Sequence, residues 1–176
     1  EHRLTQEARL ELRVVDDLGR PVAGARTRLS ILGRPSELPE LAGSTDALGR
    51  ATVTRLPAGR GDVYVSAKGY PIAGPIAAHL QPGATRSIDV ELIRFGSIKA
   101  LVVDQRGMPM QGVRVELRPT QPGVDGRLGF TAADSGRCLF TDVVPGQYAL
   151  SADRANPVPV EVAPGEVHDV TIKIVE

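Results

Sequence analysis

The sequence has few residues that could cross-link the chain or build an aromatic core. Its 176 residues include one cysteine, no tryptophan, three tyrosines and three phenylalanines. A single cysteine, Cys138, excludes a disulfide within the chain. A core must therefore be built mainly from Val, Leu, Ile and Ala, and the 41% of hydrophobic residues is ordinary for a globular protein.

The chain also lacks an excess of charge of either sign and any long apolar run. Lys and Arg together number 21, as do Asp and Glu, and the arginines are spread along the whole sequence. This balance gives no electrostatic reason to expect a nucleic acid or an anionic membrane as partner. No signal peptide is recognisable, and the apolar runs are too short for a membrane span, so we expect no membrane insertion.

Residues that could carry chemistry are few and scattered. The histidines are His2, His79 and His168, and none lies near a Ser or Cys in a nucleophile motif. We expect exposed histidines, no catalytic site and no cofactor. Cys138 is expected to be a small buried hydrophobe. The turn aspartates lack the spacing of a calcium loop, so we expect them to cap their own backbone and to bind no metal.

The sequence contains two copies of one pattern. The first motif of each copy aligns with Asp, Gly, Pro and Gly in register, and five further segments follow in the same order. The first motifs are Val15-Asp16-Asp17-Leu18-Gly19-Arg20-Pro21-Val22-Ala23-Gly24-Ala25 and Val103-Asp104-Gln105-Arg106-Gly107-Met108-Pro109-Met110-Gln111-Gly112-Val113. We infer an N-terminal extension, 1–7, and two modules, 8–94 and 95–176, with almost no linker.

Apolar residues alternate with polar ones in both copies, as in Leu10, Leu12 and Val14. Successive side chains of a strand point to opposite faces, so this period of two predicts antiparallel sheets with one buried face. Turn residues recur about every 8–12 residues, a spacing typical of β-sandwiches. No helical stripe of useful length is present. The sequence predicts an all-β protein.

The motifs resemble those of a known family. Each copy has Val-Asp-x-x-Gly-x-Pro-x-x-Gly, then an Asp-to-Gly-Arg turn, then Leu/Val-Pro before a Ser-Ala strand. This pattern resembles carboxypeptidase regulatory-like domains and is similar to Cna B-type repeats and the transthyretin-like (prealbumin-like) fold. The resemblance implies two tandem Greek-key β-sandwiches of seven strands each.

The resemblance also implies a function. Such modules act as spacers, stalks or accessory domains, so we expect a non-catalytic structural or adhesive module of an exported bacterial protein. Its location would be extracellular, on the cell surface or periplasmic, and its partners other protein domains or copies of itself. The alternative is a carbohydrate-binding accessory module, with Tyr70 and Phe130 as candidate ligand-binding residues. An enzyme ranks last, because related hydrolases group their histidines at one site.

Two further features of the sequence bear on function. Some Cna B-type repeats form a Lys–Asn isopeptide bond, and the resemblance places its Lys two residues before the Asp of the first motif. Val14 and Val102 stand there, and Lys99 is expected on the solvated face, so we expect no such bond. Separately, Arg60-Gly61-Asp62 spells an integrin-recognition tripeptide, which we expect in an exposed loop and regard as a chance match.

Overall fold

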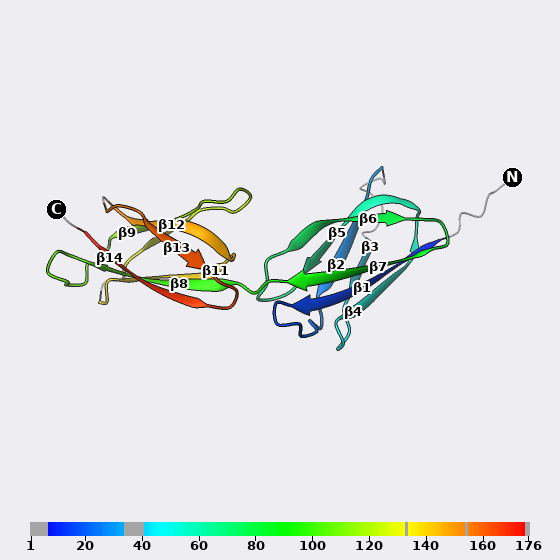
Figure 1. Cartoon of the computed structure of the whole chain (residues 1–176), viewed down its shortest axis with the longest axis horizontal. Coiled ribbons are helices and arrows are strands. Elements are labelled where there is room, and N and C mark those ends of the chain that lie inside the picture. Colours follow the sequence, from blue (N-terminus) through cyan, green and yellow to red (C-terminus); the bar gives the residue numbers. More distant parts are fainter. Residues whose placement is uncertain (1–6, 34–40, 133, 154, 175–176) are drawn as a thin grey trace. The chain divides into compact units, whose positions relative to one another are not determined.

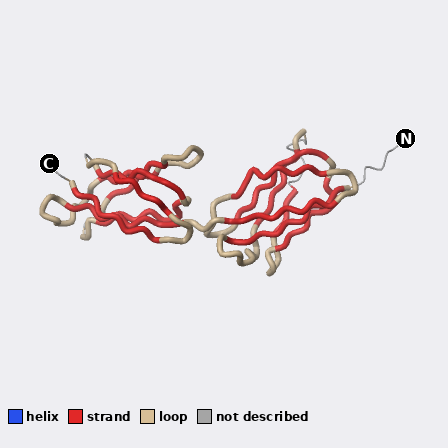
Figure 2. Tube along the Cα trace, in the orientation of Figure 1, coloured by secondary structure: helices blue, strands red, loops and turns tan. Residues whose placement is uncertain are grey.

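The protein consists of strands and loops, with no helix among residues 7–33, 41–132, 134–153 and 155–174, which are those that the computed structural model describes (Figure 2). In this part of the chain no helix is therefore long and apolar enough to cross a membrane. The contacts divide the protein into two compact units, Glu1–Ile93 and Arg94–Glu176. The expected extension 1–7 lies outside the described residues except for Glu7.

The first unit is a sandwich of two sheets, in the orders β4-β1-β7 and β3-β2-β5-β6 (Figure 1). Its strands are β1 (Ala8–Asp16), β2 (Arg26–Ile31), β3 (Leu41–Ser44), β4 (Arg50–Leu56), β5 (Gly59–Ser66), β6 (Ala73–Leu80) and β7 (Thr85–Leu92). The first strand lies between the fourth and the seventh, which gives the sandwich its Greek-key connections.

The second unit repeats this arrangement, with sheets β11-β8-β14 and β10-β9-β12-β13. Its strands are β8 (Gly96–Val103), β9 (Arg114–Pro119), β10 (Arg127–Phe130), β11 (Arg137–Val143), β12 (Gly146–Ala152), β13 (Val158–Val162) and β14 (Val167–Lys173). The predicted fold class, two tandem seven-stranded β-sandwiches, is confirmed.

One detail of the sheets differs from the prediction of antiparallel pairing throughout. The first and last strands of each unit, β1 with β7 and β8 with β14, pair in parallel, whereas the other pairs are antiparallel. Alternation of apolar and polar residues is the same in both kinds of pairing. The sequence pattern therefore finds the strands but does not tell which way their neighbours run.

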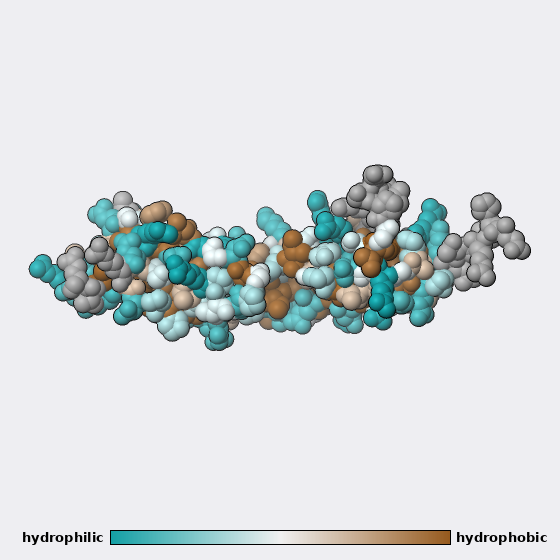
Figure 3. Space-filling model, turned by 90° about the horizontal axis from the view of Figure 1, so that it is seen from above, coloured by the Kyte–Doolittle hydropathy of each residue, from teal (hydrophilic) through white to brown (hydrophobic). Residues whose placement is uncertain are grey.

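The alternating residues form the two cores as expected. Leu10, Leu12 and Val14 of β1 are all at most 3% exposed, and the largest fully buried side chains among the described residues are Leu, Ile and Val. In the second unit Phe140, Tyr148 and Cys138 join the aliphatic residues. On the face shown in Figure 3, apolar surface is broken into separate patches between hydrophilic side chains.

The aspartates of the repeated turns cap their own backbone, as expected. The Oδ1 atom of Asp16 accepts hydrogen bonds from the backbone N–H groups of Leu18 and Arg20, both 2.9 Å long. Asp46 accepts the same pair of bonds in its turn, and so does Asp104. These carboxylates are therefore explained by local backbone geometry.

Asp16 has an additional partner that predicts a pH-dependent stability. Nε of Arg20 donates to its Oδ2 over 2.8 Å, and this bond, opposed by burial, holds the pKa of the Asp16 carboxyl below its ordinary value of 3.8. A folded-state pKa below the unfolded one stabilises the fold above about pH 4, and this stabilisation is lost as the pH falls below it.

We therefore expect Asp16→Asn to destabilise the first module at about pH 7, and we expect this difference from the wild type to shrink as the pH falls below about 4. Urea denaturation at several pH values measures it. Arg20→Met removes the same ion pair and should behave in the same way. Methionine is the replacement because Met108 stands at the corresponding position of the Asp104 turn. A destabilisation independent of pH in both variants would contradict the assigned ion pair.

Candidate functional site

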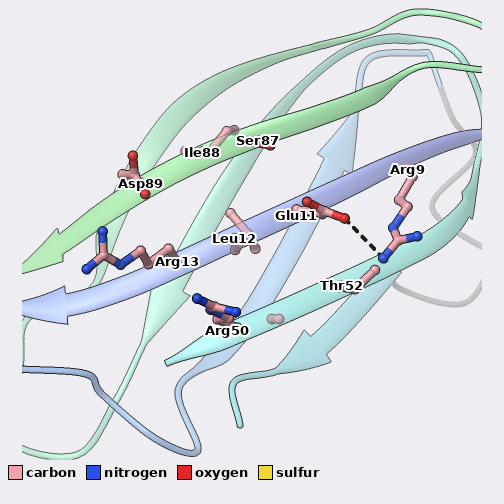
Figure 4. Close-up of a pocket in the computed structure, with 10 residues that line it drawn as sticks. Arg9, Glu11, Leu12, Arg13, Arg50, Thr52, Ser87, Ile88 and Asp89 are labelled. Carbon is pink, nitrogen blue, oxygen red and sulfur yellow. Dashed lines mark ion pairs between the residues drawn. The ribbon is translucent and has the colours of Figure 1, made fainter. Parts of the chain in front are cut away.

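A groove of about 380 Å³ lies on the outer face of the β4-β1-β7 sheet (Figure 4). Buried Leu12, Ala51 and Ile88 contribute only their backbone side to it, since their side chains are at most 8% exposed. The side chains that face outward between them are charged or carry hydroxyls: Arg9, Glu11, Arg13, Arg50, Thr52, Ser87 and Asp89. The groove is thus a polar surface built from three neighbouring strands.

The charges of this groove are unevenly matched. Arg9 and Glu11 form an ion pair of 3.0 Å, drawn as a dashed line in Figure 4. Arg13 lies directly opposite Arg50 across the antiparallel β1–β4 pair and beside Asp89 across the parallel β1–β7 pair. Two arginines therefore occupy directly opposite positions at one end of the groove, and the side chain of Arg13 extends toward Asp89 in Figure 4.

The corresponding face of the second unit is built differently. Leu101 occupies the place of Arg13, directly opposite Arg137 of β11 and beside Thr171 of β14. Lys99 is exposed on this outer face, as predicted. The arginine of the Gly-Arg turn is thus present in both units, but only the first unit sets a second arginine against it.

A larger groove, of about 880 Å³, lies on the outer face of the β3-β2-β5-β6 sheet. The half-buried ring of Tyr64 lines this groove, and the guanidinium carbon of Arg28 lies 5.2 Å from the ring centroid. The backbone passes close to this ring at Gly74, where an added Cβ would come within 2.9 Å of it. Tyr64 is thus both a residue of strand β5 and part of the lining of a surface groove.

The Arg60-Gly61-Asp62 tripeptide does not lie in a loop, and that expectation is wrong. It belongs to β5, whose residues pair with β2 on one side and β6 on the other. The register holds Gly61 opposite Ile31 and Ala78, so the tripeptide is extended backbone within a sheet. The glycines at 59 and 61 suggest a turn, so the sequence pattern does not show that the strand already begins at Gly59.

The two candidate ligand-binding residues, Tyr70 and Phe130, belong to different units. Tyr70 is half-buried in the turn between β5 and β6 and packs against the first core. Phe130 ends the edge strand β10 and is 62% exposed, two residues from the exposed Leu128. A role of either residue in ligand binding stays a prediction.

Substitution of Phe130 tests the predicted role in ligand binding without disturbing a core. Because Tyr70 contacts the core, Tyr70→Ala would change packing as well as surface, whereas Phe130→Ala removes an exposed ring. If Phe130 forms part of a sugar platform, this change should abolish signals of the wild-type protein on a glycan array. Leu128→Ala serves as the neighbouring control, and an unchanged array after Phe130→Ala would exclude the role.

The two histidines that the structure describes belong to different units. His79 lies exposed in β6 and His168 lies in β14 of the other unit, while His2 is outside the described residues. No group of three His, Cys, Asp or Glu side chains that could hold a metal ion occurs in the part of the chain that the structure describes.

Cys138 is buried, at 6% exposure, which confirms its expected place in a core. It lies opposite Gly129, whose missing side chain leaves room for the sulfur, since an added Cβ would come within 2.6 Å of it. Burial raises the pKa of the thiol above its ordinary value of 9.0, which lowers the fraction of reactive thiolate.

We therefore expect Cys138 to resist iodoacetamide in the native protein and to react fully in guanidinium chloride. Mass spectrometry after timed exposure measures both states. Rapid, complete labelling under native conditions would show that the thiol is accessible and would contradict its assignment to the core.

The positions that the resemblance assigns to an isopeptide lysine lie in the cores. Val14 and Val102 are each 0% exposed, in strands that pair with the last strand of their unit. Valine has no amine, so these sites cannot supply the nucleophile that such a bond requires.

No family model matches the chain, and no curated protein matches it. Among solved structures, GBS52, the minor pilin of the Gram-positive pathogen Streptococcus agalactiae, has a TM-score of 0.59 at 16% identity, covering 96% of this chain and 95% of that one. Two pilins share this fold. The second, a streptococcal ancillary pilin, has a TM-score of 0.53 at 18% identity. The match covers 97% of this chain and 63% of that pilin. At these identities the likeness extends to the fold alone.

Proposed function

We propose that this chain is a non-catalytic structural module of a bacterial surface assembly, acting as a subunit, spacer or stalk. The observation that carries the proposal is the match of both tandem sandwiches to GBS52, a minor pilin, over nearly the full length of each chain. The proposed partners are other protein subunits, and the proposed location is outside the cytoplasm.

The architecture of the described residues supports this role. Each sandwich has its own core of buried apolar residues, and aspartates cap turns between its strands. Such self-contained modules suit a structural role. We further propose, on the motifs quoted above, that both modules are of the carboxypeptidase regulatory-like or Cna B-type kind. Carbohydrate binding gains no support from the comparisons.

Immunogold labelling of intact cells of the source organism tests the proposal. We expect antibodies against this chain to label the cell exterior and proteinase K added to intact cells to remove the antigen. Antigen confined to the cytoplasm would refute the proposal.

A further inference from the structure

The Arg13–Arg50 pair does not stabilise the fold. Residues directly opposite in an antiparallel pair have Cβ atoms about 5 Å apart, and like charges there destabilise the sheet. Both side chains are exposed, and neither forms an ion pair with any residue in the described ranges. The pair therefore lowers the stability of the sheet, and no ion pair within the described residues offsets this loss.

The surroundings leave this end of the groove positive. Glu11 is already engaged by Arg9, so the carboxylate nearest in register to the pair is that of Asp89, opposite Arg13. Two guanidinium groups against one carboxylate leave one uncompensated positive charge. Guanidinium groups bind carboxylates through paired, charge-assisted hydrogen bonds, so one further carboxylate would neutralise the remaining positive charge.

The repeat shows that the fold does not require this pair. At the same register position the second unit places Leu101 against Arg137, and Thr171 takes the place of Asp89. Because both units have the same sheet order, a leucine at this position is sufficient for the sandwich.

The shape and chemistry of the groove select among occupants. Its outward side chains follow β1 at every second residue, about 6.6 Å apart, which is also the spacing of side chains along an extended peptide. Its lining contains no aromatic ring on which a sugar could stack. A second copy apposed antiparallel and centred on Glu11 is disfavoured, because it sets that carboxylate against its own copy and Arg13 against Arg9.

We propose that the outer face of β4, β1 and β7 binds an extended acidic segment of a partner protein, with one carboxylate held between Arg13 and Arg50. The proposal rests on the proposed function as an assembly module and names the surface through which the module meets another subunit.

Titration of the isotope-labelled full chain with hexaglutamate at low salt, followed by NMR, tests the site. We expect the amide signals of Arg13, Arg50 and Thr52 to shift and the affinity to fall as salt is added. Arg13→Leu, which copies the second unit, and Arg50→Gln should each weaken binding about threefold to fivefold. Leu101→Arg should create a second set of shifting signals around Arg137.

Hexalysine and triglucuronate are the matched probes. Hexalysine should produce no shifts at Arg13 and Arg50, and Arg13→Glu should reverse the preference between the two peptides. Hexaglutamate binding that is absent, or equal in wild type, Arg13→Leu and Arg50→Gln, overturns the proposal. Triglucuronate binding as tightly as hexaglutamate overturns the peptide as occupant. Surface labelling of cells is independent of these results, so failure of this site and failure of the proposed function remain distinguishable.

Discussion

Replacing Gly49 by alanine is expected to lower the free energy of unfolding of the first module by about 3 kcal/mol or more. Gly49 has a φ of +70°, in the left-handed region that costs other residues energy. An added Cβ would also overlap the backbone oxygen of Val14 and lie 3.2 Å from the Cβ of Pro21. The neighbouring chain cannot retreat easily, because the Gly49 carbonyl accepts a 2.7 Å hydrogen bond from the N–H of Val14.

Gly24 provides the matched control. Its φ of +69° is nearly the same, but nothing lies within 4 Å of an added Cβ. Gly24→Ala should therefore cost only the conformational part, about 1 kcal/mol. Urea denaturation of both variants measures the difference, and equal losses of stability would show that the close approach to Val14 plays no part.

Truncating one core leucine in each unit is expected to show whether the two sandwiches unfold independently. Leu56 and Leu150 are each 0% exposed, in the first and second core respectively. Leucine-to-alanine changes at such sites cost about 2–5 kcal/mol, which corresponds to a fall in Tm of about 10 °C or more for a domain of this size. We expect Leu56→Ala to lower one thermal transition and Leu150→Ala to lower another.

Differential scanning calorimetry of the full chain measures both transitions. Leu48→Ala is the control for the first unit, because Leu48 is 63% exposed and its truncation leaves no cavity. One shared transition that moves equally in both core variants would mean that the chain unfolds as a single unit. That result would refute the proposal that 8–94 and 95–176 are independently folding modules.

The strands could be predicted from the sequence because burial alternates along them. In β1 the apolar residues at even positions are buried and the polar ones between them face out, as the period of two predicts. The parallel pairing of β1 with β7 could not be predicted in this way, since alternation carries no direction. The repeat helped where single motifs could not, because two copies in the same order support one architecture.

The candidate site was largely hidden from sequence reasoning. The alternation of Leu10, Leu12 and Val14 places Arg13 on the polar face of its strand, and Arg50 is the arginine of the Gly-Arg turn. Their juxtaposition depends on the β1–β4 register, which no residue pattern fixes. The overall neutrality of the chain also masked a local excess of positive charge. Aligning the outward residues of the two repeats would have exposed the difference between Arg13 and Leu101.

The parallel pairing of terminal strands gives each module a mechanical property. Eight residue pairs, from Arg9–Thr85 to Asp16–Leu92, link β1 to β7. Tension that enters at the start of β1 and leaves at the end of β7 pulls these neighbours past each other lengthwise, so the load is shared by the whole row of hydrogen bonds. Rupture then requires many bonds to fail together, and a tether built from such units would hold under drag.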